Sequence, residues 1–195
     1  MFWFSSSRGG GFVARLAPWV PSPPSVVRVA LEAAWANKCD VLYDLGCGDG
    51  RVLVIAARDF GVRKAVGFEV DGLLVEAARI YAREYGVEDR VVVFERDLFE
   101  ADLREATLVY LYLFQSINEK LKPKLEKELR PGARVVTLDF PVPGWVPVRV
   151  VRKVDEAGRI RTIRVYVVGI SDTRYTVRGT KSDDWSAVRA WMEDC

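Results

Sequence analysis

Short apolar runs rich in β-favouring residues alternate with helical patterns along the middle of the chain. The runs that read as strands are residues 40–45, 64–69, 90–95, 107–113 and 133–140. The clearest helical pattern is residues 72–86, where Leu74, Ala77, Ala78 and Tyr81 fall on one face. A further helix is expected over residues 26–38, after the proline-rich residues 17–24. Strands that alternate with helices form βαβ units, so we expect an α/β fold with a parallel sheet covered on both faces.

The pattern changes after residue 145. Residues 146–154 and 160–170 are both β-rich and flank the turn sequence "DEAGR", with no helical stretch between them. They therefore predict an antiparallel hairpin, and its arginine-bearing face is expected to be solvated surface. Residues 182–195 are expected to form an amphipathic helix with Trp185, Val188 and Met192 turned inward.

A chain of 195 residues that is half apolar can bury one sizeable core. We expect one domain over residues 17–170, a flexible arm over 1–16 and a C-terminal tail over 171–195. The first residues lack the basic-then-apolar order of a secretory signal, and no apolar run approaches the length that spans a bilayer. We therefore expect a cytoplasmic protein without a membrane partner.

The composition excludes several kinds of active site. The chain contains no histidine, which removes a Ser-His-Asp hydrolase and a histidine-ligated zinc enzyme. The three cysteines form no paired-ligand spacing, so no metal site is expected. Charged residues make up 29% of the chain and amides are few, which resembles a thermophile's composition. A net charge of +2 is too small to indicate nucleic-acid binding.

A glycine-rich loop directly follows the first predicted strand, in "VLYDLGCGDGR". Gly46, Gly48 and Gly50 allow the backbone to turn sharply and to approach a ligand closely. Their spacing is GxGxG rather than the GxGxxG of dinucleotide-binding proteins, and Asp44 precedes them. A carboxylate at this place favours a positively charged ligand over a pyrophosphate. S-adenosylmethionine, with an ammonium and a sulfonium group, fits this requirement.

Acidic residues also stand at the ends of the next two strands. Glu69 ends the second strand and is expected to accept hydrogen bonds from ribose hydroxyls. Asp97 follows the third and is expected to accept from the adenine amino group, with Leu98 donating its backbone N–H. Each acid alone could be an ordinary solvated loop residue. Three at successive strand ends beside the glycine loop predict S-adenosylmethionine binding, because ligands bind at the carboxyl ends of such sheets.

Several segments resemble the class I methyltransferases, and more closely the archaeal broad-specificity protein-lysine methyltransferases. They are "VPSP", "YDLGCGDGR", "GFEVD", "LYLFQSINEKLKPKLEKELRPG" and "DFPVPGW", within residues 17–150. The resemblance implies a three-layer Rossmann-like fold, whose mostly parallel seven-stranded sheet ends in an antiparallel hairpin. It also implies methyl transfer to lysine amines of proteins. Ser22 and Cys47, within the first two segments, join the residues expected to bind the cofactor.

The end of the fourth strand, "LVYLYLFQSIN", is expected to lie beside the transferred methyl group. It lacks the amide or acid followed by two prolines and an aromatic residue that is typical of amide and base-amine methylation. It also lacks a cysteine nucleophile and a group of metal ligands. A lysine amine remains, because it needs only to lose its proton. Proteins that present exposed lysines are then the expected partners, with nucleic acid involved only through proteins bound to it.

An apolar channel for this amine is expected from Tyr112, Leu113 and Phe114, together with Trp19 and Trp145. Tyr112 and Asn118 are the candidate catalytic residues, although Tyr112 and Phe114 could be core residues and Asn118 a helix cap. Pro123 predicts an interruption of the following helix. Two alternatives stay open: methylation of RNA or a small molecule, and a catalytically silent module that binds S-adenosylmethionine.

Overall fold

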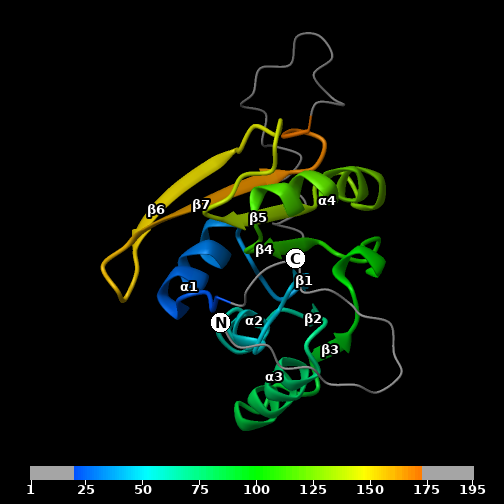
Figure 1. Cartoon of the computed structure of the whole chain (residues 1–195), viewed down its shortest axis with the longest axis vertical. Coiled ribbons are helices and arrows are strands. Elements are labelled where there is room, and N and C mark those ends of the chain that lie inside the picture. Colours follow the sequence, from blue (N-terminus) through cyan, green and yellow to red (C-terminus); the bar gives the residue numbers. More distant parts are fainter. Residues whose placement is uncertain (1–19, 173–195) are drawn as a thin grey trace, which may run out of the picture.

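The computed structural model describes residues 20–172 (Figure 1). Its seven strands are β1 (Val41–Leu45), β2 (Lys64–Glu69), β3 (Val91–Glu95), β4 (Leu108–Leu111), β5 (Arg134–Leu138), β6 (Arg149–Val154) and β7 (Ile160–Val167). Its helices are α1 (Pro24–Ala33), α2 (Arg51–Asp59), α3 (Gly72–Glu84), α4 (Gln115–Glu128) and the short 3-10 helix η1 (Leu98–Glu100). The expected arm, Trp19 and the helix expected over residues 182–195 lie outside the described residues.

The strands form one sheet in the order β3-β2-β1-β4-β5-β7-β6. The pairs from β3 to β5 are parallel, whereas β7 pairs antiparallel with both β5 and β6. The expected α/β fold with a mostly parallel sheet and an antiparallel hairpin is therefore confirmed. From β1 the strands are added towards β3 on one side, and from β4 they are added on the other side, so the topological switch point lies between β1 and β4. Open α/β sheets bind ligands in the crevice outside the carboxyl ends of the strands at such a point.

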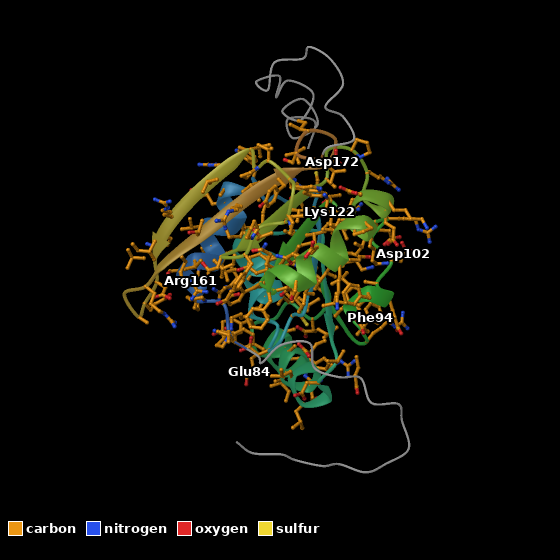
Figure 2. The ribbon with its side chains drawn as sticks, turned by 45° about the horizontal axis from the view of Figure 1, so that its top comes forward. Glu84, Phe94, Asp102, Lys122, Arg161 and Asp172 are labelled. Atoms are coloured by element: carbon orange, nitrogen blue, oxygen red, sulfur yellow. The ribbon has the colours of Figure 1, made fainter. Side chains whose placement is uncertain are left out.

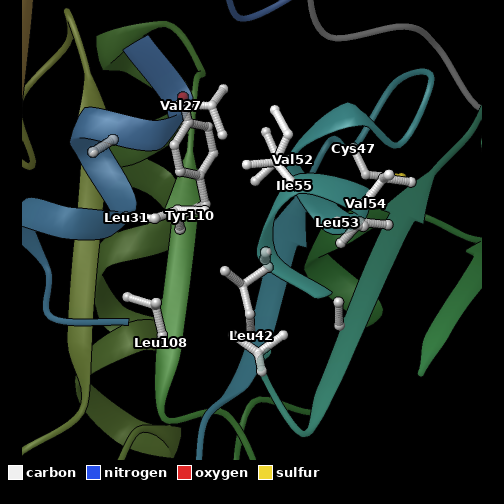
Figure 3. Packing of buried hydrophobic residues seen from close by; sticks show 14 of the residues in the cluster. Val27, Leu31, Leu42, Cys47, Val52, Leu53, Val54, Ile55, Leu108 and Tyr110 are labelled. Carbon is white, nitrogen blue, oxygen red and sulfur yellow. The ribbon is translucent and has the colours of Figure 1, made fainter. Parts of the chain in front are cut away.

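Each face of the sheet packs against its own apolar cluster, which gives three layers. One cluster joins α1, α2 and α3 to the sheet, and Figure 3 shows Val27 and Leu31 of α1 beside Leu108 and Tyr110 of β4. The other cluster joins the opposite face to α4 through Ile117, Leu121 and Leu125. Because both faces are covered, the central strands are apolar on both sides.

A buried ion pair between Arg134 and Asp40 ties several elements together at the amino ends of the parallel strands. Arg134 begins β5, and its guanidinium also donates to the carbonyl oxygens of Ala34 and Thr107. Asp40 precedes β1 and accepts a 2.6 Å hydrogen bond from the Thr107 hydroxyl, just before β4. The end of α1 and the starts of three strands are therefore held by one polar cluster.

The interruption expected at Pro123 is wrong, because α4 runs through this residue from Gln115 to Glu128. Proline removes one helical hydrogen bond, but Ile117, Leu121 and Leu125 on the inner face pack into the core on both sides of it. Asn118 is not a helix cap either. It lies fully buried inside α4, and its amide nitrogen donates to the carbonyl oxygens of Phe140 and Pro141, both at 3.2 Å.

No helix among residues 20–172 is long and apolar enough to cross a membrane.

We predict that Asp40→Asn lowers the free energy of unfolding by about 3–5 kcal/mol, because it leaves the buried Arg134 guanidinium without its counter-charge. Chemical denaturation of the purified variant measures this loss. The matched control is Asp89→Asn, which removes an exposed ion pair with Arg90 and should leave the midpoint nearly unchanged. Equal stability of the two variants would contradict the role given to the buried pair.

Candidate active site

A cavity opens at the carboxyl ends of β1, β2 and β4, at the expected edge of the sheet. Six chain segments bring residues to its wall: the approach to α1, the end of β1 with the glycine loop and the start of α2, the end of β2, the turn after β3, the end of β4 and the start of α4. The lining residues are Val20, Pro21, Ser22, Asp44, Gly46, Cys47, Asp49, Arg51, Val52, Phe68, Glu69, Val70, Arg96, Asp97, Leu98, Tyr110, Tyr112, Leu113 and Ile117.

The glycine loop connects β1 to α2 and forms one wall of this cavity. Gly46 lines it directly, whereas Gly48 and Gly50 are not among the lining residues. The backbone N–H of Gly48 donates to the Glu69 carboxylate at 3.1 Å. Gly50 has a φ of 77°, and a Cβ there would lie 2.7 Å from the Cβ of Ala78 in α3. Gly50 therefore allows α3 to pack against the start of α2 and acts on the cavity only through the loop's shape.

Asp44 is the most unusual group in the cavity. It is only 3% exposed, and its side chain accepts no hydrogen bond and forms no ion pair within residues 20–172. Burial, together with the negative charges of Glu69 and Asp49, raises the pKa of this carboxyl well above its usual value. A buried carboxylate without a partner is costly, and a cation bound in the cavity would relieve that cost.

Glu69 and Asp97 lie at the side of the cavity formed by β2 and β3. Glu69 accepts the N–H groups of Val70 and Asp71 through Oε1 and that of Gly48 through Oε2. A carboxylate has about four acceptor positions, so one position on Oε2 is left for a ligand hydroxyl. Asp97 accepts the N–H of Phe99 and caps η1, and the buried residue Leu98 also lines the cavity.

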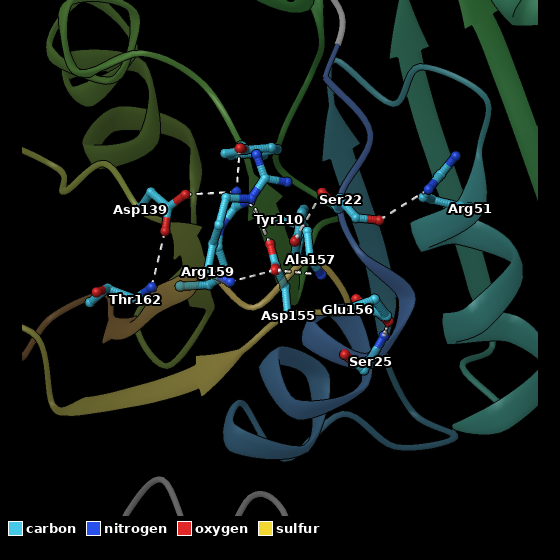
Figure 4. A network of polar contacts seen from close by, with 12 residues as sticks. Ser22, Ser25, Arg51, Tyr110, Asp139, Asp155, Glu156, Ala157, Arg159 and Thr162 are labelled. Carbon is cyan, nitrogen blue, oxygen red and sulfur yellow. Dashed lines mark hydrogen bonds and ion pairs between the residues drawn. The ribbon is translucent and has the colours of Figure 1, made fainter.

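The segment before α1 closes over the cavity from another direction. The Tyr110 hydroxyl donates to the Ser22 Oγ at 3.2 Å, and Arg51 donates to the Ser22 carbonyl oxygen at 3.3 Å (Figure 4). Arg51 is itself held by Asp49, with Nη2 and Oδ2 2.5 Å apart. Burial raises the pKa of Tyr110, so this phenol stays protonated as a donor. The sequence analysis did not predict four polar residues of this wall, which are Asp49, Arg51, Arg96 and Tyr110. Asp49 and Arg51 could have been found from their position beside the glycines in "GDGR".

The residues expected to form the channel divide into two groups. Tyr112 and Leu113 line the cavity just beyond the end of β4, as expected. Phe114 does not line it: its side chain is 43% exposed and meets the ring of Phe140 edge-on. The placement of Trp145 in the channel is also corrected. This residue is 5% exposed, packs against the Tyr166 ring and donates through Nε1 to Glu126.

Asn118 is likewise absent from the cavity wall, and Trp19 lies outside the described residues. The Asn118 amide instead links α4 to the segment that follows β5. Cys47 does line the cavity, but burial and the nearby Asp44 charge raise the pKa of its thiol. A thiol with a raised pKa is a poor nucleophile, so Cys47 contributes shape rather than covalent chemistry.

The model of the ANTKMT methyltransferase domain matches residues 44–149, which include the end of β1, all of β2 to β5 and most of the cavity wall. The chain belongs to this family. It is an S-adenosylmethionine-dependent methyltransferase, and the buried Asp44 carboxylate fits a cofactor that carries an ammonium group.

Several other methyltransferases are similar to this chain over more than half of its length. A protein-lysine N-methyltransferase from Saccharolobus islandicus is 45% identical over 152 residues, which are 78% of this chain and 94% of that protein. The mouse adenine nucleotide translocase lysine N-methyltransferase is 43% identical over 110 residues, 56% of this chain and 48% of that protein. A crystal structure of an RNA methyltransferase from Salinibacter ruber with S-adenosyl-L-homocysteine is 43% identical, with a TM-score of 0.72. The matched region is 83% of this chain and the whole of the Salinibacter ruber chain.

We predict that Asp44→Asn stabilises the cofactor-free methyltransferase by about 1–3 kcal/mol at pH 7, because it removes a buried charge without a partner. The pKa of Asp44 is raised in the folded state, so ionisation costs stability as the pH rises from the unfolded pKa through the folded one. The advantage of the variant should therefore shrink towards pH 4 and vanish below it.

Urea unfolding of both proteins across pH 4–8 measures this difference. The same substitution should weaken the binding of S-adenosylhomocysteine by about 10- to 100-fold, since the ligand loses its counter-charge. A variant that is less stable at every pH, or that binds the ligand as tightly as the wild type, would show that Asp44 has another role.

Proposed function

We propose that this methyltransferase transfers the methyl group of S-adenosylmethionine to lysine side-chain amines of proteins, with broad specificity. The observation that carries the proposal is the 45% identity to the protein-lysine N-methyltransferase of Saccharolobus islandicus, across 94% of that protein. The relatives from mouse and Xenopus laevis are also named as lysine methyltransferases, the first of the adenine nucleotide translocase and the second of an ATP synthase component. Proteins that present exposed lysines are therefore the proposed partners.

The order of the strands supports a direction for the bound cofactor. Asp97 and Leu98 follow β3, Glu69 ends β2, Asp44 lies in β1 and Tyr112 follows β4, and these strands are neighbours in this order. We assign the adenine to Asp97 and Leu98, the ribose to Glu69 and the ammonium group to Asp44. Ser22, Gly46 and Cys47 complete the wall around it. The methyl group then points towards Tyr112 and Leu113, where the acceptor amine would enter.

The cofactor supplies an electrophilic methyl group, so the protein has to deliver a neutral amine in line with it. Neutralising a lysine of ordinary pKa at pH 7 costs about 4–5 kcal/mol. The aromatic and aliphatic side chains of Tyr112, Leu113 and Ile117 make the wall apolar at this end, which favours the neutral amine over the ammonium form. Among the described residues, no group of three potential metal-ligating side chains is present. Alignment and desolvation are the contributions that these residues can make.

Tyr112 is the residue that we propose to contact the acceptor, because its side chain lines this end of the cavity. Asn118 is proposed to act indirectly. It holds the start of α4 against residues 140 and 141 and so supports the segment that carries Tyr112 and Leu113.

The second candidate function is methylation of RNA, which the name of the Salinibacter ruber relative favours. The whole of that protein matches this chain with 43% identity, so RNA has to be included among the acceptors that are tested.

The charge-rich, amide-poor composition and the relative from an archaeon support the further proposal that the protein works in the cytoplasm of a thermophilic archaeon. Residues 17–170 are proposed to form the whole methyltransferase domain, with the segments 1–16 and 171–195 outside it.

The decisive experiment incubates the protein with S-adenosylmethionine labelled in the methyl group and with separate pools of protein, RNA and metabolites. We expect label in the protein pool, recovered as methylated lysine after complete hydrolysis. Asp44→Asn serves as the control in which cofactor binding is weakened, and it should incorporate less label at a subsaturating concentration of cofactor. Label found only in RNA would replace the lysine proposal.

We also predict that the rate at saturating cofactor rises with pH from 7 to about 9.5, because a larger fraction of the acceptor amine is neutral. Initial rates with a lysine-bearing protein substrate measure this profile. A chelator should leave the rate unchanged. A bell-shaped profile centred near neutral pH, or a requirement for Mg²⁺, would argue against transfer to an otherwise unactivated amine.

A further inference from the structure

A buried arginine lies directly beside the tyrosine at the reacting end of the cavity. Arg161 belongs to β7, is only 4% exposed and comes from the antiparallel hairpin rather than from the parallel part of the sheet (Figure 2). Its Nη2 donates a hydrogen bond to the Tyr112 hydroxyl, and its guanidinium carbon lies 5.1 Å from the centre of the Tyr112 ring. Both the ring and the hydroxyl of Tyr112 are therefore in contact with one rigid cation.

Two carboxylates fix the guanidinium in place. Nη2 of Arg161 lies 2.7 Å from Oδ2 of Asp139, and Nη1 lies 3.3 Å from Oδ2 of Asp155. Arg159 neutralises the second carboxylate further, at 3.2 Å from Asp155 (Figure 4). Two positive and two negative charges balance in this cluster, so it adds little net field to repel an incoming ammonium group.

The two carboxylates are themselves held by the backbone. Asp139 follows β5 with a φ of 62°, a left-handed conformation that is uncommon outside glycine. It exchanges hydrogen bonds with Thr162, from its own N–H at 2.7 Å and to its carboxylate at 3.0 Å. Asp155 accepts the N–H groups of Ala157 and Arg159 in the hairpin turn, each at 2.9 Å. The position of Arg161 is therefore determined by two carboxylates at the start of β7, one from the segment after β5 and one from the hairpin turn.

We propose that Arg161 is a positioning residue for methyl transfer, and that it acts by holding Tyr112 at the reacting end of the cavity. The inference rests on the proposed reaction at this site. Tyr112 lies beyond the last residue of β4, so the sheet's hydrogen bonds do not fix its direction. The contact with Arg161 supplies that constraint, because a planar guanidinium donates in a fixed geometry.

The contact also determines which part of the phenol is left for the acceptor. Arginine has donors but no acceptor, so it occupies a lone pair of the Tyr112 oxygen and cannot take the hydroxyl proton. The other lone pair remains for an N–H of the incoming amine. An amine held by its N–H keeps its own lone pair directed at the methyl group, which the displacement requires.

A double-mutant cycle tests this proposal with Arg161→Gln, Tyr112→Phe and the combined variant, all assayed on an acceptor that the wild type methylates. We expect Arg161→Gln to lower kcat by about 10- to 100-fold, with the KM for S-adenosylmethionine within about threefold of the wild type. In the Tyr112→Phe background, Arg161→Gln should cost almost nothing more, because the hydroxyl that it positions is gone. Arg161→Lys should recover part of kcat.

The matched control is Arg152→Gln, the same change at an exposed residue of the same hairpin, which should keep wild-type kcat. Calorimetric titration with S-adenosylhomocysteine checks that each variant still forms the cofactor site. If Arg161→Gln does not fold, Asp139→Asn replaces it in the cycle, since it loosens the guanidinium while keeping the side chain's size.

Losses that multiply in the combined variant, or an unchanged kcat in Arg161→Gln, would overturn the proposal and leave Arg161 as a purely structural link. Failure of the lysine proposal is a separate result. It would be seen in the wild-type protein as the absence of label in the protein pool, before any variant is compared.

Discussion

The buried pair of Arg134 and Asp40 sets the alignment on which the rest of the molecule depends. Parallel strands pair through evenly spaced hydrogen bonds, and a slip by one residue would turn every side chain to the opposite face. The pair joins the residue before β1, the first residue of β5 and, through Thr107, the start of β4. A buried ion pair is an uncertain source of stability, but it specifies one arrangement strongly, because any other leaves charges unsatisfied.

The two ends of the sheet use buried charge in opposite ways. At the amino ends of the strands, Asp40 is enclosed and satisfied by Arg134, Thr107 and the N–H of Asn37. At the carboxyl ends, Asp44 is also buried, but it lines the cavity and has no partner among the described residues. Only three residues separate Asp40, which completes the fold, from Asp44, which lies in the cavity wall. The buried charge that has no partner among the described residues therefore lies in the wall of the cavity.

The sequence predicted the sheet, the hairpin and many of the residues that line the cavity because these features have local signals. Apolar runs mark the strands, and the glycine loop with Asp44, Glu69 and Asp97 follows strand ends in a regular way. Trp145, Phe114 and Asn118 do not line the cavity, because the direction of each side chain depends on contacts with distant parts of the chain. The contact of Arg161 with Tyr112 joins residues that lie 49 positions apart in the chain, so no local sequence pattern predicts it.

The hairpin has a consequence for how such enzymes diversify. Most of the cavity wall comes from residues before β4, whereas Tyr112 contacts Arg161, which in turn contacts Asp139, and both follow Tyr112 in the chain. In the assignment proposed above, donor binding and acceptor handling are encoded in successive stretches of sequence. Changes in the hairpin would then alter the acceptor end without disturbing the donor end. Such a division of labour is consistent with relatives that share this domain and yet carry the names of different acceptors.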